Sequence, residues 1–330
     1  MSTRLLLTAT FGWALATSLL AEDKLWVNEY EKARQTAATE GKDLLMDFTG
    51  SDWCSWCIKL HKEVFDLEAF KTAAPKNFVL VELDYPQDKS KLSKEVQEQN
   101  AELQKQFSIR GYPTILLADA GGRPYAQTGY QPGGADVYLK HLEELRAVKT
   151  KRDEAWKKAE SVQGSEKAKF LAEGIKALDF DLAAAHYKPV FEEIAKLDPK
   201  DENGLTASFS FRSDMEAVTA KLMEAASKGE AGGARKVIDD FLTAHPKATA
   251  VQKQEALMAV LNTYRPPKDN EAVLKLMEDV KALGAESEAG QRAEMISKQV
   301  RMMIEKSKEG AGKDVPTDAV PARKVIPAEK

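Results

Sequence analysis

Two residues of the chain have side chains and spacing suited to redox chemistry. Cys54 and Cys57 are the only cysteines among 330 residues, and they stand in the string Trp53-Cys54-Ser55-Trp56-Cys57. The apolar run Leu44–Phe48 before them predicts a buried strand, and Ile58–Val64 after them predicts a helix. Two thiols at such a junction can form a disulfide with little rearrangement. The first sulfur also lies at a helix N-terminus, where free N–H groups and the helix dipole favour a thiolate, so the pair predicts thiol–disulfide exchange.

Two other roles for the cysteine pair carry less weight. A disulfide that closes so short a loop removes little entropy from the unfolded chain, which makes a purely stabilising role weak. A zinc clip is the other alternative, because two thiolates at this spacing suit Zn²⁺. Structural zinc sites use four protein ligands, however, and the sequence has no second cysteine pair. We therefore predict no resident metal and no other cofactor.

The first residues have the pattern of an export signal. Arg4 precedes the apolar stretch Leu5–Leu20, and small residues allow cleavage after Ala21 or Ala16. A retained membrane anchor is the alternative. We predict a signal peptide over residues 1–21 and an exported protein, periplasmic if the cell is bacterial. No stable membrane insertion is expected after the signal is cleaved.

The charge pattern argues against nucleic acid as a partner. The chain has 48 basic and 52 acidic side chains, and its net charge is −4. Acidic and basic residues alternate along most of the sequence, which is typical of solvated helix faces. No basic field for a polyanion is predicted.

Residues 22–148 alternate between helix and strand patterns, which predicts a central mixed sheet with flanking helices. The predicted helices cover about residues 26–40, 58–64, 67–73, 92–106 and 135–146, and the predicted strands cover residues 44–48, 78–84, 114–118 and 124–128. Gly41 ends the first helix. Strand patterns vanish after Lys149, and residues 149–306 predict paired helices, as in an α-helical hairpin array. Residues 307–330 are expected to be a disordered tail.

Residues 26–146 resemble the thioredoxin superfamily. Three features match in order: Met46-Asp47-Phe48 in the strand that enters the site, the Trp-Cys-x-x-Cys string, and Ile109-Arg110-Gly111-Tyr112-Pro113-Thr114 some fifty residues later. The tandem tryptophans and the lead-in Phe48–Asp52 resemble exported members more than the cytosolic enzyme. The resemblance does not extend to the helical half of the chain.

The resemblance implies a role for each matching residue. Cys54 is the nucleophile and Cys57 the resolving thiol that releases the reduced partner. Asp47 matches the buried carboxylate that takes the proton of the resolving cysteine, although it lies one residue further from the first cysteine than in ordinary thioredoxins. The alternative for Asp47 is the solvent side of an edge strand.

The resemblance also implies a surface that binds the client protein. Pro113 matches the family's cis-proline, which aims the backbone of Tyr112 at an extended client segment; an ordinary trans proline at a strand start is the alternative. Trp53 and Trp56 are expected to form an apolar docking rim; the alternative is that one of them packs inward. Ser55 and Trp56 are expected to tune the redox potential, and the absence of histidine between the cysteines favours a reducing one.

The sequence therefore predicts an exported thiol–disulfide oxidoreductase, with the reductase direction favoured. Its partners are protein disulfide or dithiol clients and an upstream thiol redox partner. The alternative is a helical scaffold that carries a redox-sensitive thioredoxin-like docking module. His61 lies four residues beyond Cys57 and is interpreted as a surface or packed histidine, because no partner motif accompanies it.

Overall fold

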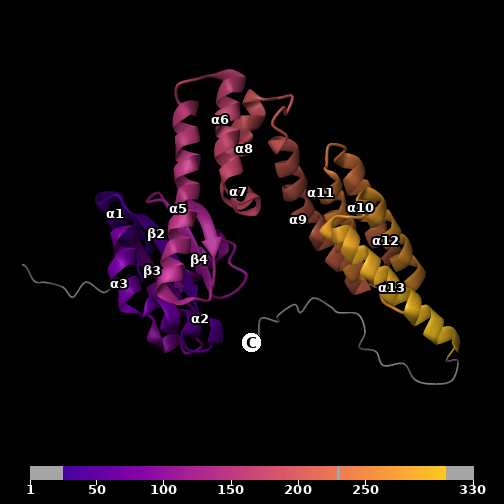
Figure 1. Ribbon diagram of the computed structural model, residues 1–330, viewed down its shortest axis with the longest axis horizontal. Coiled ribbons are helices and arrows are strands. Elements are labelled where there is room, and N and C mark those ends of the chain that lie inside the picture. Colours follow the sequence, from indigo (N-terminus) through magenta and orange to yellow (C-terminus); the bar gives the residue numbers. More distant parts are fainter. Residues whose placement is uncertain (1–24, 229–230, 310–330) are drawn as a thin grey trace, which may run out of the picture. The chain divides into compact units, whose positions relative to one another are not determined.

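The described part of the chain forms two compact units. The computed structural model describes residues 25–228 and 231–309, and the division between the units falls between Val148 and Lys149. Strands and helices alternate in the first unit, whereas the described residues of the second unit form helices and no strands (Figure 1). This confirms the predicted α/β fold followed by a helical region. The predicted signal peptide over residues 1–21 lies outside the described residues.

The sheet of the first unit has five strands in the order β1-β3-β2-β4-β5. The strands are β1 (Trp26–Val27), β2 (Asp43–Thr49), β3 (Phe78–Asp84), β4 (Thr114–Ala118) and β5 (Pro124–Thr128). β1, β3 and β2 run parallel to one another, and β4 and β5 complete the sheet by antiparallel pairing. β2 is therefore a central strand, and all seven of its residues are buried. Burial of both faces explains why it reads as an apolar run in the sequence.

Each helix predicted for the first unit has a counterpart in the structure. They are α1 (Tyr30–Glu40), α2 (Ser55–Leu60), the π-helical turn η1 (His61–Phe65), α3 (Glu68–Ala73), α4 (Lys94–Gln106) and α5 (Gly134–Ala159), with short 3₁₀ turns at Ala74–Lys76 and Lys89–Lys91. α5 extends well beyond the predicted end near residue 146 and contains the division between the units. α1 ends at Gly41, whose φ of 65° lies in the left-handed region that glycine adopts without strain.

The prediction that the first helix opens at Trp26 is wrong. Trp26 and Val27 form β1 and pair in parallel with Leu80 and Val81, while α1 begins only at Tyr30. An aromatic and a β-branched residue suit a strand, and pairing at the edge of β3 outweighs the helical spacing of the apolar side chains.

Alternation along β2 divides the first unit into two layers. Leu44, Met46 and Phe48 face a core that includes residues of α1 and α4, such as Tyr30 and Leu103. The intervening residues of β2 point to the opposite face of the sheet. Asp47 is one of them, and His61 contacts it on this face.

The second unit is built from paired helices. They are α6 (Gly164–Ala177), α7 (Phe180–His186), α8 (Lys188–Leu197), α9 (Leu205–Lys228), α10 (Ala231–Ala244), α11 (Ala250–Val260), a 3₁₀ turn (Leu261–Thr263), α12 (Asn270–Leu283) and α13 (Glu288–Glu309). α6 packs on α8, α9 on α10, α11 on α12, and α12 on α13. α13 continues to Glu309, so the predicted disordered tail from residue 307 begins too early, because residues 305–309 are good helix formers. The rest of that tail lies outside the described residues.

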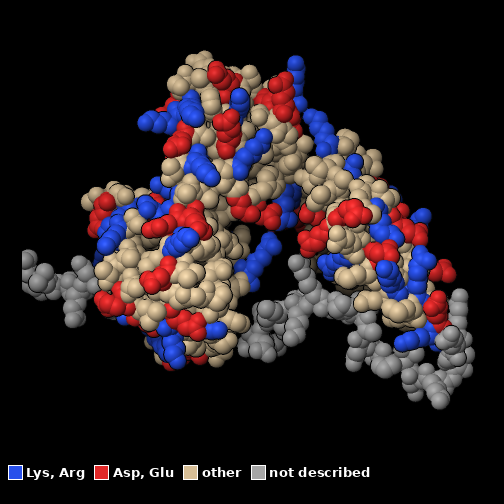
Figure 2. Space-filling view, viewed as in Figure 1, with Lys and Arg blue, Asp and Glu red and all other residues tan. Residues whose placement is uncertain are grey.

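The surface of the described part of the chain carries charges of both signs (Figure 2). Lys and Arg side chains are interspersed with Asp and Glu side chains over the face shown in Figure 2. Within residues 25–228 and 231–309, no helix combines the length and apolar character that a bilayer crossing requires.

Candidate active site

The cysteine pair lies where β2 passes into α2, as the sequence predicts. A turn that follows Thr49 brings the backbone N–H of Cys54 to the Gly50 carbonyl at 2.9 Å. Cys54 is the N-cap residue of α2, and its sulfur accepts the backbone N–H of Cys57 at 3.2 Å. The two residues form a disulfide, with their Cα atoms 5.2 Å apart.

The two sulfurs differ in their access to solvent. Cys54 is 6% exposed, whereas Cys57 has no exposed surface. Cys54 is therefore the more exposed half of the disulfide. Its position at a helix N-terminus favours a thiolate when the disulfide is reduced.

Asp47 is fully buried on the same side of the sheet as α2. Its Oδ2 lies 2.8 Å from Nε2 of His61. Burial is the main effect on Asp47 and raises its pKa, although the contact with His61 opposes the shift. Burial also acts to lower the pKa of His61, but the hydrogen bond and charge of Asp47 outweigh it and raise that pKa. The pair thus holds a proton more tightly than either side chain does in water.

Further acidic side chains surround this pair. Glu82 is the register partner of Asp47 on the neighbouring strand β3, and its pKa is raised by burial and by the nearby carboxylates of Asp47 and Asp84. Asp84 accepts hydrogen bonds from the backbone and the hydroxyl of Ser51, at 2.9 and 2.6 Å. The field at His61 is therefore negative.

The Tyr112–Pro113 peptide bond is cis. The Tyr112 hydroxyl accepts a hydrogen bond from the side-chain amide of Gln104 at 2.7 Å, and partial burial raises its pKa to about 12. The Tyr112 ring meets the Trp53 ring edge-to-face, with centroids 5.6 Å apart. This contact brings the Gly-Tyr-Pro-Thr string and the cysteine string to one place in the fold.

Both tryptophans of the cysteine string are exposed. Trp53 is 43% exposed, and its indole N–H donates to the Tyr85 carbonyl at 2.8 Å. Trp56 is 55% exposed and packs against Tyr130, with ring centroids 5.3 Å apart. The amine of Lys59 lies over both of these rings, 5.2 Å from Trp56 and 4.9 Å from Tyr130. Trp53 with Tyr112 and Trp56 with Tyr130 therefore form two aromatic pairs, each containing a residue next to a cysteine, and we call them the aromatic rim.

Sequence reasoning missed several residues of this site. His61 was interpreted as a surface or packed histidine, yet it is the hydrogen-bond partner of Asp47. Its helical spacing of four from Cys57 was the available signal. Lys59 lies three residues after Trp56 on the same helix, and that spacing was its available signal. Glu82 and Tyr130 carried no signal, because only strand register and loop packing bring them to the site.

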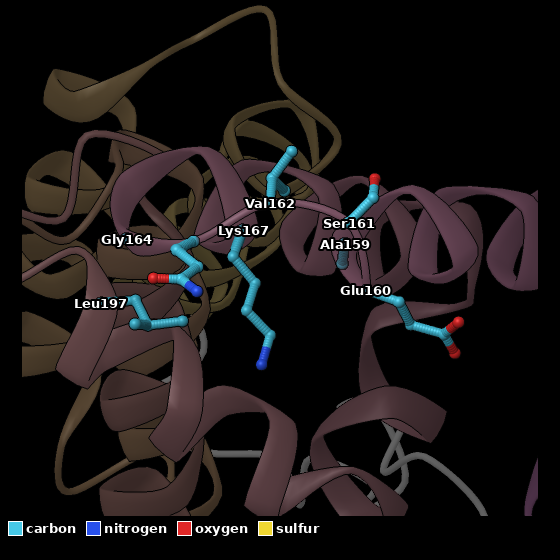
Figure 3. A pocket seen from close by; sticks show the side chains of 8 residues that line it. Ala159, Glu160, Ser161, Val162, Gly164, Lys167 and Leu197 are labelled. Atoms are coloured by element: carbon cyan, nitrogen blue, oxygen red, sulfur yellow. The ribbon is translucent and has the colours of Figure 1, made fainter.

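The described residues contain no group of three or more His, Cys, Asp or Glu side chains that is arranged to hold a metal ion. A hollow of about 490 Å³ lies within the second unit, at the junction of α5 and α6 (Figure 3). Lys167 lines it and pairs with Glu193 of α8 at 2.6 Å, so its charge is used to join two helices. None of the predicted site residues lines this hollow.

Comparison with known proteins places this site in a family. Residues 30–146 match the family described as thioredoxin-like domain. The disulfide bond reductase DsbH of Chlamydia pneumoniae is 34% identical over 123 residues, which cover 37% of this chain and 74% of DsbH. The thioredoxin-related protein DsbJ of the same organism is 29% identical over 119 residues, 34% of each chain. A solved structure of a DsbH oxidoreductase has 29% sequence identity and a TM-score of 0.36, and the match covers 42% of this chain and 94% of that one.

The chain belongs to the thioredoxin superfamily. Its Cys54–Cys57 disulfide and its relatives together identify it as a thiol–disulfide oxidoreductase. The matches to the two relatives span little more than a third of the chain.

Proposed function

We propose that the protein is an exported reductase of protein disulfides. The observation that carries this proposal is the asymmetry of the cysteine pair, in which Cys54 is the more exposed half, at a helix N-terminus, and Cys57 has no exposed surface. The reductase direction is supported by the lack of histidine between the cysteines and by the name of the relative DsbH, a disulfide bond reductase. Export rests on the apolar stretch Leu5–Leu20, and a bacterial cell would place the protein in the periplasm.

The reaction begins with the reduced pair. The Cys54 thiolate attacks one sulfur of the client disulfide, forms a mixed disulfide and expels the other client sulfur as a thiolate. Cys57 loses its proton to Asp47, and the resulting thiolate attacks Cys54, which releases the second client thiolate and restores the Cys54–Cys57 disulfide. An upstream thiol redox partner must then supply two electrons to reduce the pair again.

The client is held by backbone and aromatic contacts. Tyr112 presents its backbone beside the cis-Pro113, and an extended client segment pairs with it as a strand does. Trp53 and Trp56 cover the flanking client residues. Ser55 and Trp56 carry no positive charge, so neither stabilises the Cys54 thiolate. This keeps the reduction potential low.

The test is to trap the mixed disulfide. A Cys57→Ser variant keeps the nucleophile but lacks the resolving thiol, so it should accumulate covalent adducts with client proteins that reducing agent dissolves. The Cys54→Ser/Cys57→Ser double variant is the matched control and should trap none. A Cys57→Ser protein that forms no adducts with disulfide-bonded proteins would contradict the proposal.

The reduction potential decides the direction. We expect a value near −270 mV, as for thioredoxin, and far from the roughly −120 mV of a strong thiol oxidant. The pair can be followed by the fluorescence of Trp53 and Trp56 in a thiol redox buffer. A value below about −300 mV would mark the disulfide as structural.

A second function is binding by the helical unit. Its helices leave large apolar side chains exposed, among them Met223 of α9 and Met295 of α13. Under this alternative the cysteine domain is a redox-sensitive docking module on a scaffold. Partner binding that is unchanged in the double cysteine variant would favour the scaffold over exchange chemistry.

A further inference from the structure

The buried carboxylate of Asp47 is hydrogen-bonded to His61, whose side chain is partly exposed to solvent. Asp47 has no exposed surface, and among residues 25–228 and 231–309 its Oδ1 has no hydrogen-bond partner. Its Oδ2 contacts Nε2 of His61 at 2.8 Å, and the His61 side chain is 22% exposed. His61 is therefore a titratable group that connects the buried Asp47 carboxylate with solvent.

The backbone places His61 on the same helix face as the resolving cysteine. His61 follows Cys57 by four residues, a spacing at which side chains of a helix are neighbours. It is also the first residue of the π-helical turn, where its carbonyl accepts the backbone N–H of Asp66 at 2.8 Å. The rings of Trp26 and Phe65 lie 5.9 and 5.1 Å from the imidazole and hold it in place.

The charged groups around His61 come from every element packed against it. Asp47 lies on β2, Glu82 and Asp84 lie on β3, and Asp66 follows η1; the phenol of Tyr138 on α5 also feels the charge of Asp47. The carboxylates of Asp47, Glu82 and Asp66 act directly on His61 and favour a proton on it. The contact of 2.8 Å keeps the imidazole and the Asp47 carboxylate in position to share that proton.

We propose that His61 is the proton relay of the exchange reaction, passing protons between the buried Asp47 and solvent. The proposal rests on the function proposed above. When Cys57 attacks the mixed disulfide, its thiol proton moves to Asp47. His61 releases a proton from its other ring nitrogen to water, and its Nε2 takes the proton from Asp47 Oδ2. The steps reverse when the Cys54–Cys57 disulfide is reduced again and Cys57 regains its proton.

The test separates the two chemical steps in single-turnover reactions with a disulfide-bonded peptide. In His61→Gln, an amide N–H still donates to Asp47, but the residue cannot titrate. We expect the mixed disulfide to form at the wild-type rate and its resolution at pH 7 to slow by roughly tenfold or more, the lower range of general acid–base effects. The titration of His61 should also vanish from the pH profile of resolution. His141→Gln is the matched control, since His141 contacts the Thr128 hydroxyl at 2.9 Å in the same unit and should leave both steps unchanged.

Chemical rescue distinguishes a relay from a structural role. His61→Ala leaves a gap of imidazole size beside Asp47, and added imidazole should restore most of the lost resolution rate. A His61→Gln protein that resolves at the wild-type rate, or a slow His61→Ala protein that imidazole does not rescue, would overturn the relay. Failure of the wild type to form the mixed disulfide would instead overturn the proposed function.

A further test keeps His61 itself unchanged, so its result does not depend on whether the His61 variants fold. Nuclear magnetic resonance should show the His61 imidazole titrating at a raised pKa in the wild type and at a lower pKa in Asp47→Asn. A His61 titration that ignores Asp47 would also overturn the relay.

Discussion

At the scale of single residues, the site combines a disulfide, of which Cys54 is the more exposed half, with buried carboxylates that differ in how many hydrogen bonds they accept. Asp43 and Asp47 both lie on β2 and are both buried. Asp43 accepts hydrogen bonds from the Tyr125 hydroxyl at 3.0 Å and the Arg146 guanidinium at 3.4 Å. Asp47 has a contact to His61 and an Oδ1 without a partner among the described residues. Burial of a poorly paired carboxylate costs stability and favours a group that binds and releases protons.

Asp47→Asn should stabilise the protein at alkaline pH. Burial raises the folded-state pKa of Asp47 above its ordinary value of 3.8, so the folded protein holds this proton more tightly than the unfolded chain. The stability that the protonated Asp47 contributes is therefore present below pH 3.8 and is lost as pH rises through the folded-state pKa. Asparagine cannot ionise, and we expect the free energy of unfolding at pH 8 to rise by on the order of 1–2 kcal/mol.

Denaturant titration at pH 4 and pH 8 checks this prediction. The difference between the variant and the wild type should be small at pH 4 and large at pH 8. Asp43→Asn is the control with the opposite sign, because it weakens the bonds from Tyr125 and Arg146. Destabilisation by Asp47→Asn at pH 8 would show that the ionised carboxylate is a net stabilising group.

At the scale of elements, the turn between β2 and α2 sets the position of the aromatic rim. The Gly50 carbonyl accepts the backbone N–H groups of Trp53 and Cys54, at 3.3 and 2.9 Å. The Trp53 indole folds back over this glycine and reaches the Tyr85 carbonyl. A Cβ on Gly50 would lie 2.6 Å from Trp53 Cε2, so the turn has no room for one. The glycine is therefore needed for the close approach of the ring.

Gly50→Ala should move Trp53 and weaken client binding. The indole must leave its place and lose its bond to the Tyr85 carbonyl, so we expect KM for a disulfide-bonded client to rise roughly twofold to tenfold, the equivalent of one hydrogen bond of about 0.5–1.5 kcal/mol. Tryptophan fluorescence should change as well. Gly232→Ala in α10 is the control, because a Cβ there also meets no atom within 4 Å and the residue lies outside the cysteine domain. An unchanged KM in Gly50→Ala would remove Trp53 from the client surface.

At the scale of the whole molecule, each unit has a hydrophobic core of its own. The first core joins β2, β3 and β4 to α1 and α4, and the second joins α9 to α13. Both cysteines belong to the first unit. Oxidation and reduction therefore act directly on the stability of that unit alone.

Calorimetry should separate the units by their response to reductant. We expect two unfolding transitions, because each unit has its own core. Reduction of Cys54–Cys57 should lower the melting temperature of one transition by a few degrees, since about 1 kcal/mol corresponds to roughly 4–8 °C in a domain of about 100 residues. The double cysteine variant should not respond to reductant. A single transition that shifts with reductant would show that the units unfold together.

Local patterns predicted the elements well where packing did not compete with them. Leu44–Phe48 and Phe78–Asp84 read as buried strands, and both are strands of the sheet. The prediction failed at Trp26, where strand pairing overrides a helical pattern, and at residue 307, where a polar composition continues a helix. At Trp26 the outcome depended on pairing with β3, which is distant in sequence. At residue 307 it depended on the preceding turns of α13, which the chain continues.

The sequence by itself determined that the chain carries two cysteines, separated by two residues, at a strand-to-helix junction. It also determined that a Gly-Tyr-Pro-Thr string follows them. These features are local, because they depend on the order of a few residues and on turn and helix preferences. Only the tertiary structure decided that Asp47 meets His61, that Glu82 stands beside Asp47, and that Tyr130 packs on Trp56. Those contacts follow from strand register and from the packing of helices on the sheet, which bring together residues far apart along the chain.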